Sequence, residues 1–277
     1  MRFEKLPLRQ KRALGYKRLF LAFRIEAPWP QQLAKGRLIA ARERHMTLAF
    51  LGEQPWPSLR DQLARLPLPP FSTGLVGRFV RSLSLPPGHN RVIAWEAEAL
   101  EPRKLFLYQH RLMEWLLEEG LLSCEKAALP SWLPHVTLCR APFDRRGWEE
   151  LFAPLPFSMS ELHLYESLGD LHYGPLWSHL LPRPFLVESQ DDQLRIQAVG
   201  NSWSQLFAHL ATAIQFVYRE TNLNHKVEEA LSSRGAMVDR LRQLLSSLPH
   251  IAATSFRSLP TAERELLSEE LLFTLVL

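Results

Sequence analysis

The quartet His-x-Thr-Leu occurs twice in this chain, at residues 45–48 and again 90 positions later at 135–138. Each copy lies in an apolar run next to proline or glycine, which is typical of a buried strand. Because side chains alternate faces along a strand, the His and the Thr of each copy point the same way. We therefore expect two similar halves that bring these two strands together.

Two facing copies would place two imidazoles, of His45 and His135, and two hydroxyls, of Thr47 and Thr137, in one cavity. One imidazole can accept a proton from an attacking hydroxyl or water while the other donates a proton to the departing oxygen, each contributing about 10²–10⁴ in rate. The hydroxyls can hold the non-bridging oxygens of a phosphodiester. A lone His-x-Thr is more often a half-buried strand histidine, but the duplication favours a catalytic site. The sequence leaves open which histidine is the acid.

The rest of the pattern mixes short apolar runs, which predict strands, with longer stretches of helical periodicity. This mixture predicts an α+β fold with two similar halves, followed by a smaller, helix-rich α+β domain. We expect strands at 19–23, 45–51, 76–83, 92–98, 135–139, 161–165 and 194–199, and helices within 53–70 and at 104–119, 148–152, 203–217, 238–245 and from 261.

Charge and composition change at residues 182–184, Pro-Arg-Pro, which predicts a domain boundary there. Up to Arg183 the chain holds 25 Lys and Arg against 18 Asp and Glu, or +7, and the rest holds 8 against 11, or −3. The positive field of the first part suits an anionic partner. We expect a basic arm at 1–16, a main domain at 17–183 and a second domain at 184–277.

Composition excludes several classes of protein. A chain of 277 residues with 46% hydrophobic and 22% charged residues is globular rather than disordered or fibrous. No apolar run reaches the roughly 18–20 residues of a membrane span, and the N-terminal residues lack the features of a signal peptide. Cys124 and Cys139 are too few for a disulfide scaffold or a four-cysteine zinc site. We expect a cytoplasmic protein.

The residues around both quartets resemble the 2H phosphoesterases, in particular the RNA 2′,3′-cyclic phosphodiesterases that are also called 2′-5′ RNA ligases. The resemblance covers residues 17–183. It implies two pseudo-symmetric lobes of antiparallel sheet with outer helices around a basic cleft, both motifs on the cleft floor, and no metal or other cofactor. The family usually has a longer, helix-containing segment between its first strand and its first motif, so one wall of the cleft is expected to be thin. The matching segments are RLFLAF at 18–23, HMTLAFLG at 45–52, PHVTLCR at 134–140 and LYES at 164–167.

The resemblance also implies an activity: metal-independent opening of 2′,3′-cyclic phosphates at RNA ends to 2′-phosphates, in RNA end processing or repair. Two alternatives stay open. The same site could cleave 2′-5′ oligoadenylates or cyclic nucleotides, because the cleft walls rather than the quartets select the substrate. The protein could also bind RNA ends or assist an RNA ligase with little turnover. None of these functions requires a membrane.

Five further residues are candidate substrate contacts. Arg140 closely follows the second quartet, although strand alternation places it on the opposite face unless the strand ends or bulges first. Arg42 and Arg44 precede the first quartet and could contact phosphate, with a solvated basic edge as the alternative. Tyr165 and Tyr173 could stack on a base or contact phosphate, or simply belong to the core or its rim. The histidines without a matching motif are interpreted as structural or surface residues: His89, His110, His163, His172 and His179.

Residues 194–207 resemble the opening of archease, a small cofactor of RNA ligation, with a strand, a Gly-Asn-Ser turn and an alanine-rich helix. The resemblance implies an α+β domain with an RNA ligase as its partner. In archease a metal-binding Asp precedes this strand, whereas Asp191 and Asp192 fall outside the register that the family uses. The alternative is a helical domain that packs against the main domain or binds another partner.

Overall fold

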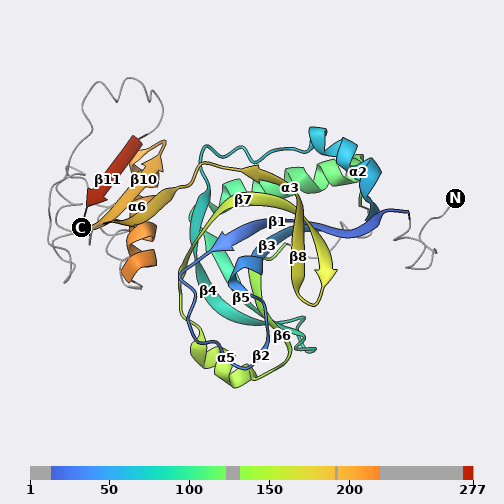
Figure 1. Cartoon of the computed structure of the whole chain (residues 1–277), viewed down its shortest axis with the longest axis horizontal. Helices are drawn as coiled ribbons and strands as arrows, with labels where there is room; N and C mark the ends of the chain where they lie inside the picture. The colour runs from blue at the N-terminus through green and yellow to red at the C-terminus, as the bar shows by residue number, and fades with distance from the viewer. Residues whose placement is uncertain (1–13, 123–131, 191–192, 219–270, 277) are drawn as a thin grey trace.

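The computed structural model describes residues 14–122, 132–190, 193–218 and 271–276, and it has an α+β fold built on two antiparallel sheets (Figure 1). The larger sheet contains β1 (Tyr16–Glu26), β2 (Gly36–Leu38), β3 (His45–Pro55), β4 (Leu75–Leu85), β5 (Val92–Ala99), β6 (His135–Phe143), β7 (Pro156–Gly169) and β8 (His172–Leu180). Beside it lie the helices α2 (Trp56–Gln62), α3 (Pro102–Glu118) and α5 (Arg145–Leu151) and the 3₁₀ turns η2 (Ala41–Glu43) and η3 (Leu63–Arg65). The smaller unit contains β9 (Phe185–Gln190), β10 (Gln193–Gly200), α6 (Trp203–Tyr218) and β11 (Leu271–Val276).

Six strands of the larger sheet form a closed ring in the order β1-β3-β6-β5-β4-β7, because β7 also pairs with β1. Closure leaves these six strands without a free edge. Together with β8 and β2, which lie outside the ring, these strands form two lobes, β3-β1-β7-β8 and β2-β6-β5-β4, which meet at two junctions. At one junction β4 pairs with β7 through four residue pairs. At the other, β3 meets β6 through one pair, Met46 opposite Val136.

The two lobes are related by an approximate two-fold symmetry that exchanges β3 with β6, β1 with β5 and β7 with β4. In each lobe the Thr of the quartet lies opposite an alanine of the neighbouring strand, and the register then shifts by one residue. The Leu of each quartet is therefore the extra residue of a β-bulge, which explains why both copies carry it. The pairs are Thr47 with Ala22 and Ala49 with Leu21 in one lobe, and Thr137 with Ala94 and Cys139 with Ile93 in the other.

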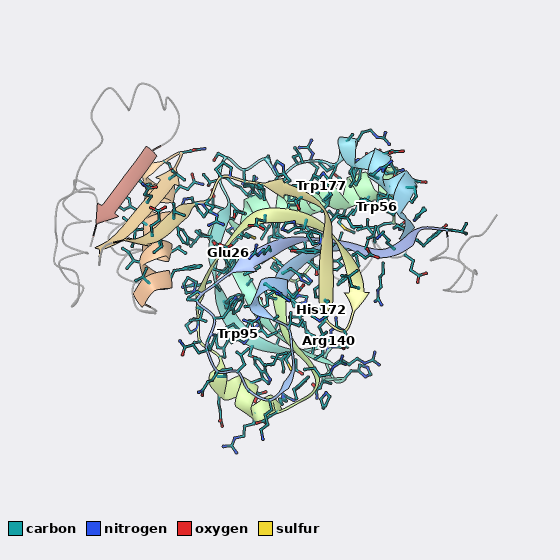
Figure 2. All side chains as sticks on the ribbon, in the orientation of Figure 1. Glu26, Trp56, Trp95, Arg140, His172 and Trp177 are labelled. Carbon is teal, nitrogen blue, oxygen red and sulfur yellow. The ribbon has the colours of Figure 1, made fainter. Side chains whose placement is uncertain are left out.

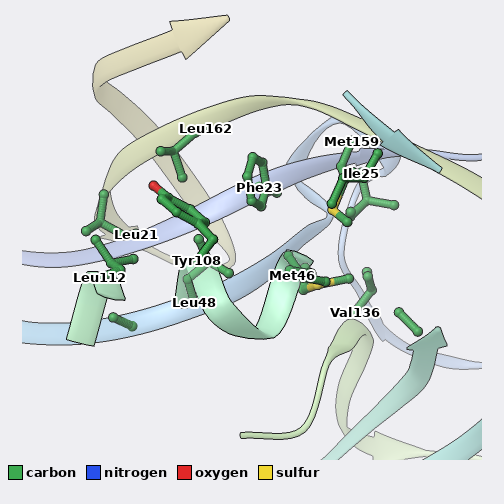
Figure 3. Packing of buried hydrophobic residues seen from close by; sticks show 14 of the residues in the cluster. Leu21, Phe23, Ile25, Met46, Leu48, Tyr108, Leu112, Val136, Met159 and Leu162 are labelled. Atoms are coloured by element: carbon green, nitrogen blue, oxygen red, sulfur yellow. The ribbon is translucent and has the colours of Figure 1, made fainter. Parts of the chain in front are cut away.

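One apolar core packs against the face of the sheet that the histidines do not occupy. Met46 and Val136, the middle residues of the two motifs, are fully buried in it (Figure 3). Helix α3 covers this core because its apolar residues recur at helical spacing, and Tyr108 and Leu112 contribute from it. Each such side chain contributes about 1.5–3 kcal/mol when fully buried. The core therefore holds both motif strands from behind.

The segment between β1 and β3 contains β2 and η2 and no α-helix. Strand β2 lies close against β6, where a Cβ on Gly36 would clash with Cys139 Sγ. The Arg44 guanidinium stacks at 4.4 Å on the ring of Trp29, and its Nε donates to the carbonyl of Ile39 at 3.1 Å. A stacked arginine and a close strand thus anchor this short segment immediately before His45.

The α+β class and the antiparallel lobes predicted from the sequence are confirmed. Each predicted strand lies within an observed one, and helices are found at α2, α3, α5 and α6 as expected. Strands β2, β8 and β9 were not predicted, because glycine and proline interrupt or border these runs, as at Gly174 and Pro175 in β8. The helix predicted at 238–245, the first residues of the helix predicted from 261, and most of the basic arm lie outside the described residues. Residues 271–276 form strand β11 and not the continuation of a helix, because this apolar run pairs with β10.

The smaller unit follows the predicted strand–turn–helix pattern and contacts the main sheet through α6. This helix packs on β9, β10 and β11 and also on β4 and β7. Side-chain hydrogen bonds join the described parts of the two units: Asn201 Nδ2 donates to Ser72 Oγ at 2.6 Å, and Gln205 Nε2 donates to Glu101 Oε2 at 3.3 Å. Within the described ranges, no helix combines the length and hydropathy needed to cross a bilayer.

Candidate functional site

The candidate site is built around the junction of β3 and β6. Since Met46 lies opposite Val136 in an antiparallel pair, the register sets His45 beside Thr137 and Thr47 beside His135. Met46 and Val136 point into the core, so the four motif side chains share the opposite face. The two histidines are diagonal neighbours in this register, and diagonal neighbours in a regular antiparallel pair are about 7–8 Å apart. One phosphoryl group can lie between them.

Both imidazoles are oriented by the same backbone contact. Nδ1 of His45 lies 2.7 Å from the carbonyl oxygen of Glu43, and Nδ1 of His135 lies 2.8 Å from the carbonyl oxygen of Leu133. Because a carbonyl oxygen only accepts, Nδ1 carries the proton in each neutral ring and Nε2 carries the lone pair. Each histidine therefore has a defined tautomer, with Nε2 left for chemistry.

A hydrogen bond from the approach to the second motif reaches the strand of the first. Nε1 of Trp132, three residues before His135, donates to the backbone carbonyl of Thr47 at 2.9 Å. This carbonyl is accessible because β3 and β6 pair at only one residue and then separate. The indole thus ties the two motif strands together beside the single pair that joins them.

His45 sits in an aromatic environment from β1, β7 and β8. Its ring centroid lies 4.8 Å from Phe20, 5.6 Å from Tyr165 and 4.8 Å from Tyr173, which meets it edge-on. Ala22, fully buried between Phe20 and Arg24 on the same face of β1, leaves room for these rings. Both predicted tyrosines are therefore next to His45.

Burial in this environment lowers the pKa of His45 to about 4. Loss of hydration is the main cause, the hydrogen bond to the Glu43 carbonyl acts in the opposite direction, and the positive charges of His135 and Arg140 lower the pKa further. His45 is therefore a neutral imidazole at physiological pH and can accept a proton at Nε2. Because the charge of Arg140 affects the pKa of His45, Arg140 lies close enough to the site to interact with a charge bound there.

Arg140 reaches the face of the motif because of the bulge in β6. Strand alternation alone would direct its side chain away from the face of Thr137. The extra residue Leu138 reverses the alternation, because Leu138 and Cys139 both point into the core. Arg140, which pairs with Val92, therefore points to the motif face. Its equivalent after the bulge in β3 is Phe50, an exposed residue whose ring lies 6.0 Å from Phe20.

Arg42 and Arg44 differ in their environments. The side chain of Arg44 is 3% exposed and packs on Trp29 away from the motif face, which corrects the expectation that it contacts phosphate directly. Burial lowers its pKa to about 10, so it stays charged and holds the segment before His45 in place. Arg42 is exposed and lies 3.6 Å from Glu43.

The β7–β8 hairpin is fastened beside the site at two points. Oε2 of Glu43 accepts a hydrogen bond from the backbone N–H of Tyr173 at 3.1 Å. At the hairpin turn, Asp170 accepts a hydrogen bond from Arg37 on β2 at 3.2 Å, and so links the two lobes. Figure 2 shows His172 of this hairpin on the same side of the molecule as Arg140. Glu43 thus orients His45 with its backbone and the hairpin with its side chain.

No sequence pattern marks Phe20, Glu43 or Arg24 as site residues. Phe20 and Arg24 alternate with core residues in β1 and share the face of Ala22, but only the register with β3 shows that this is the motif face. His163, predicted to be structural, is buried and bonds Ser178 Oγ at 2.7 Å and Glu161 Oε2 at 3.1 Å. Among the residues described, no cluster of three or more His, Cys, Asp or Glu could hold a metal ion.

Comparison with known proteins finds similarity only among solved structures. No protein-family model matches the chain, and no curated protein matches it. The structure of Escherichia coli LigT with 3′-AMP is similar with a TM-score of 0.45 and 23% identity, over 60% of this chain and 98% of that one. LigT in its apo form gives 0.45 and 22%, over 61% and 99%. The protein TT0787 of Thermus thermophilus gives 0.42 and 25%, over 60% and 98%.

We predict that the imidazole of His45 stays neutral, with its proton on Nδ1, as the pH falls to about 4, because burial disfavours the charged ring. Two-dimensional ¹H–¹⁵N NMR of the histidine rings measures this titration, and the spectrum of His45→Gln assigns the resonances. A midpoint near 6.5, the ordinary value for histidine, would contradict the site described here.

Proposed function

We propose that residues 17–183 form a 2H phosphoesterase domain that opens 2′,3′-cyclic phosphates at RNA ends and leaves 2′-phosphates. The observation that carries the proposal is the single pair of Met46 with Val136, which sets both His-x-Thr motifs on one face. The resemblance of the residues around both quartets to the 2H phosphoesterases agrees with this arrangement. Both motifs and both bulges belong to the segments that carry the resemblance.

The arrangement suits a phosphoryl group placed over the junction. The register sets each histidine beside the threonine of the other motif, and the Nδ1 contacts leave Nε2 of each ring for the phosphoryl group. The hydroxyls of Thr47 and Thr137 can donate to the non-bridging oxygens, and Arg140 adds a positive charge. Donors fixed in advance stabilise the charge that develops on these oxygens in the transition state.

The lowered pKa of His45 supports an assignment of the two roles that the sequence left open. His45 is neutral, so its Nε2 accepts the proton of the attacking water. The oxygen of water bonds to phosphorus while the bond from phosphorus to O3′ breaks, and His135 donates its proton to the departing O3′. The product is a 2′-phosphate with a free 3′-hydroxyl. The two rings end with their protonation states exchanged, and exchange with solvent restores them.

Two features favour a nucleic acid as the substrate. The exposed ring of Phe50 lies on the motif face, and aromatic faces stack on the bases of single-stranded RNA. The main domain also carries the positive charge of the chain, which raises the local concentration of polyanions. Participation of the C-terminal unit with an RNA ligase stays a prediction from its resemblance to archease.

We expect an RNA oligonucleotide ending in a 2′,3′-cyclic phosphate to be converted to the 2′-phosphate, since the donated proton goes to O3′. Chromatography against both monophosphate standards identifies the product, and a 3′-phosphate would contradict the assignment of the leaving oxygen. Parallel reactions with 2′-5′ oligoadenylate and 2′,3′-cyclic AMP test the alternative substrates. Tight, salt-dependent RNA binding without turnover would instead favour a binding or ligase-assisting protein.

His45→Ala and His135→Ala are each expected to lower turnover by about 100-fold or more, because each removes one proton-transfer group. The matched control is His110→Ala, an exposed histidine on α3 that should retain wild-type turnover. Incubation with EDTA should leave the rate unchanged. Near-complete activity of either motif variant, or loss of activity on chelation, would refute a two-histidine mechanism without metal.

A further inference from the structure

We propose that Arg24 binds the phosphodiester next to the reacting one, so that the substrate is an oligonucleotide rather than a mononucleotide. This inference rests on the function proposed above and adds a second phosphate subsite to it. Arg24 lies directly opposite His45 in the β1–β3 register and on the same face. Neither the quartets nor the segments that resemble the 2H phosphoesterases include it.

The position of Arg24 separates it from the reacting phosphate. In the strand order β1-β3-β6, β1 lies on the far side of β3 from β6. Neighbouring strands are about 4.8 Å apart, so Arg24 is one strand spacing farther than His45 from the β3–β6 junction. His45 therefore stands between Arg24 and the point where the two motifs meet. A phosphate bound by Arg24 is a different phosphate from the one between the histidines. A nucleic acid strand supplies both when it passes over His45 toward β1.

Arg24 has donors available for such a phosphate. Its side chain is 38% exposed, and among the described residues only Nη1 donates, to Glu161 Oε2 at 3.2 Å. A guanidinium has five N–H donors in a planar fork that matches the oxygens of a phosphate. A half-exposed ion pair with a single contact is weak. A phosphate can therefore bind Arg24 beside Glu161 or take the place of Glu161.

A partly buried network holds Arg24 in place. Glu161 is bonded by His163, which is itself bonded to Ser178, so that the chain of contacts runs from β1 through β7 to β8. Burial acts to raise the pKa of the Glu161 carboxyl, but Arg24 and His163 outweigh it and hold that pKa below its usual range. The ionised carboxylate keeps the guanidinium beside His45 before any ligand arrives.

The pseudo-symmetric position gives the substrate a direction. Opposite His135, where symmetry would place a second arginine, stands Glu96, which pairs with Arg81. A carboxylate there disfavours a second phosphate on that side. The residues directly opposite the two histidines thus differ in sign, Arg24 within an ion pair with Glu161 and Glu96 within one with Arg81. We therefore expect the strand to leave the site over β1 rather than over β5.

The test compares a short oligoadenylate ending in a 2′,3′-cyclic phosphate with 2′,3′-cyclic AMP, which lacks the second phosphate. We expect the wild-type protein to prefer the oligonucleotide, and Arg24→Gln to lower the ratio of the two kcat/KM values about tenfold. Arg24→Lys, which keeps the charge without the fork, should lower it about threefold. Arg146→Gln on α5, which removes another exposed arginine of an ion pair, is the matched control and should keep the wild-type ratio. Equal losses on both substrates, or an unchanged ratio, would overturn the subsite.

A binding measurement separates this inference from the proposed function. The affinity for an oligoadenylate with a 2′-phosphate end is measured against salt concentration, with no turnover involved. Loss of one phosphate contact in Arg24→Gln should reduce the slope of log K against log salt by about 0.7. If the protein turns over neither cyclic phosphate, the proposed function fails while this slope still tests the subsite. An unchanged slope would exclude a phosphate contact at Arg24.

Discussion

The site depends on one contact between two strands, the backbone pair of Met46 with Val136. It closes the ring of six strands and fixes the relative register of the two motifs at the same time. A shift of one residue would turn a histidine into the core and a buried apolar side chain onto the motif face, because side chains alternate along each strand. The core behind the two central residues therefore specifies the geometry of the reacting groups in front of them.

The features that the two histidines share follow from the two-fold symmetry of the lobes. The differences between their environments arise where the lobes depart from that symmetry. Both rings donate Nδ1–H to a carbonyl two residues earlier, and both motifs end in a bulge at leucine. Among the described residues, the aromatic rings of Phe20, Tyr165 and Tyr173 gather around His45 and not around His135. Beyond the two bulges, Phe50 stands where Arg140 stands in the other lobe. Two copies of one motif thus lie in different environments, as the proposed roles of base and acid require.

Much of the fold and the four motif residues could be predicted because local patterns encode them. The strands around both quartets and the helix α3 follow from apolar periodicity within short windows. The arrangement of the lobes could not be derived in this way, since a closed ring depends on pairings between distant strands. Arg44 illustrates why local patterns do not predict every environment. A charged residue next to a motif is expected to be exposed, but Arg44 is buried against Trp29, which lies fifteen positions earlier in the chain. The face of Arg140 depended on a bulge that alternation alone does not reveal.

The central claim is that His45 and His135 act on one phosphoryl group, and a crystal structure with bound 2′-AMP tests it most directly. We expect both Nε2 atoms to lie within hydrogen-bond distance, about 2.6–3.2 Å, of oxygens on the same phosphate. The hydroxyls of Thr47 and Thr137 should contact its non-bridging oxygens. A phosphate bound by only one of the two histidines, with the other ring turned elsewhere, would contradict the account.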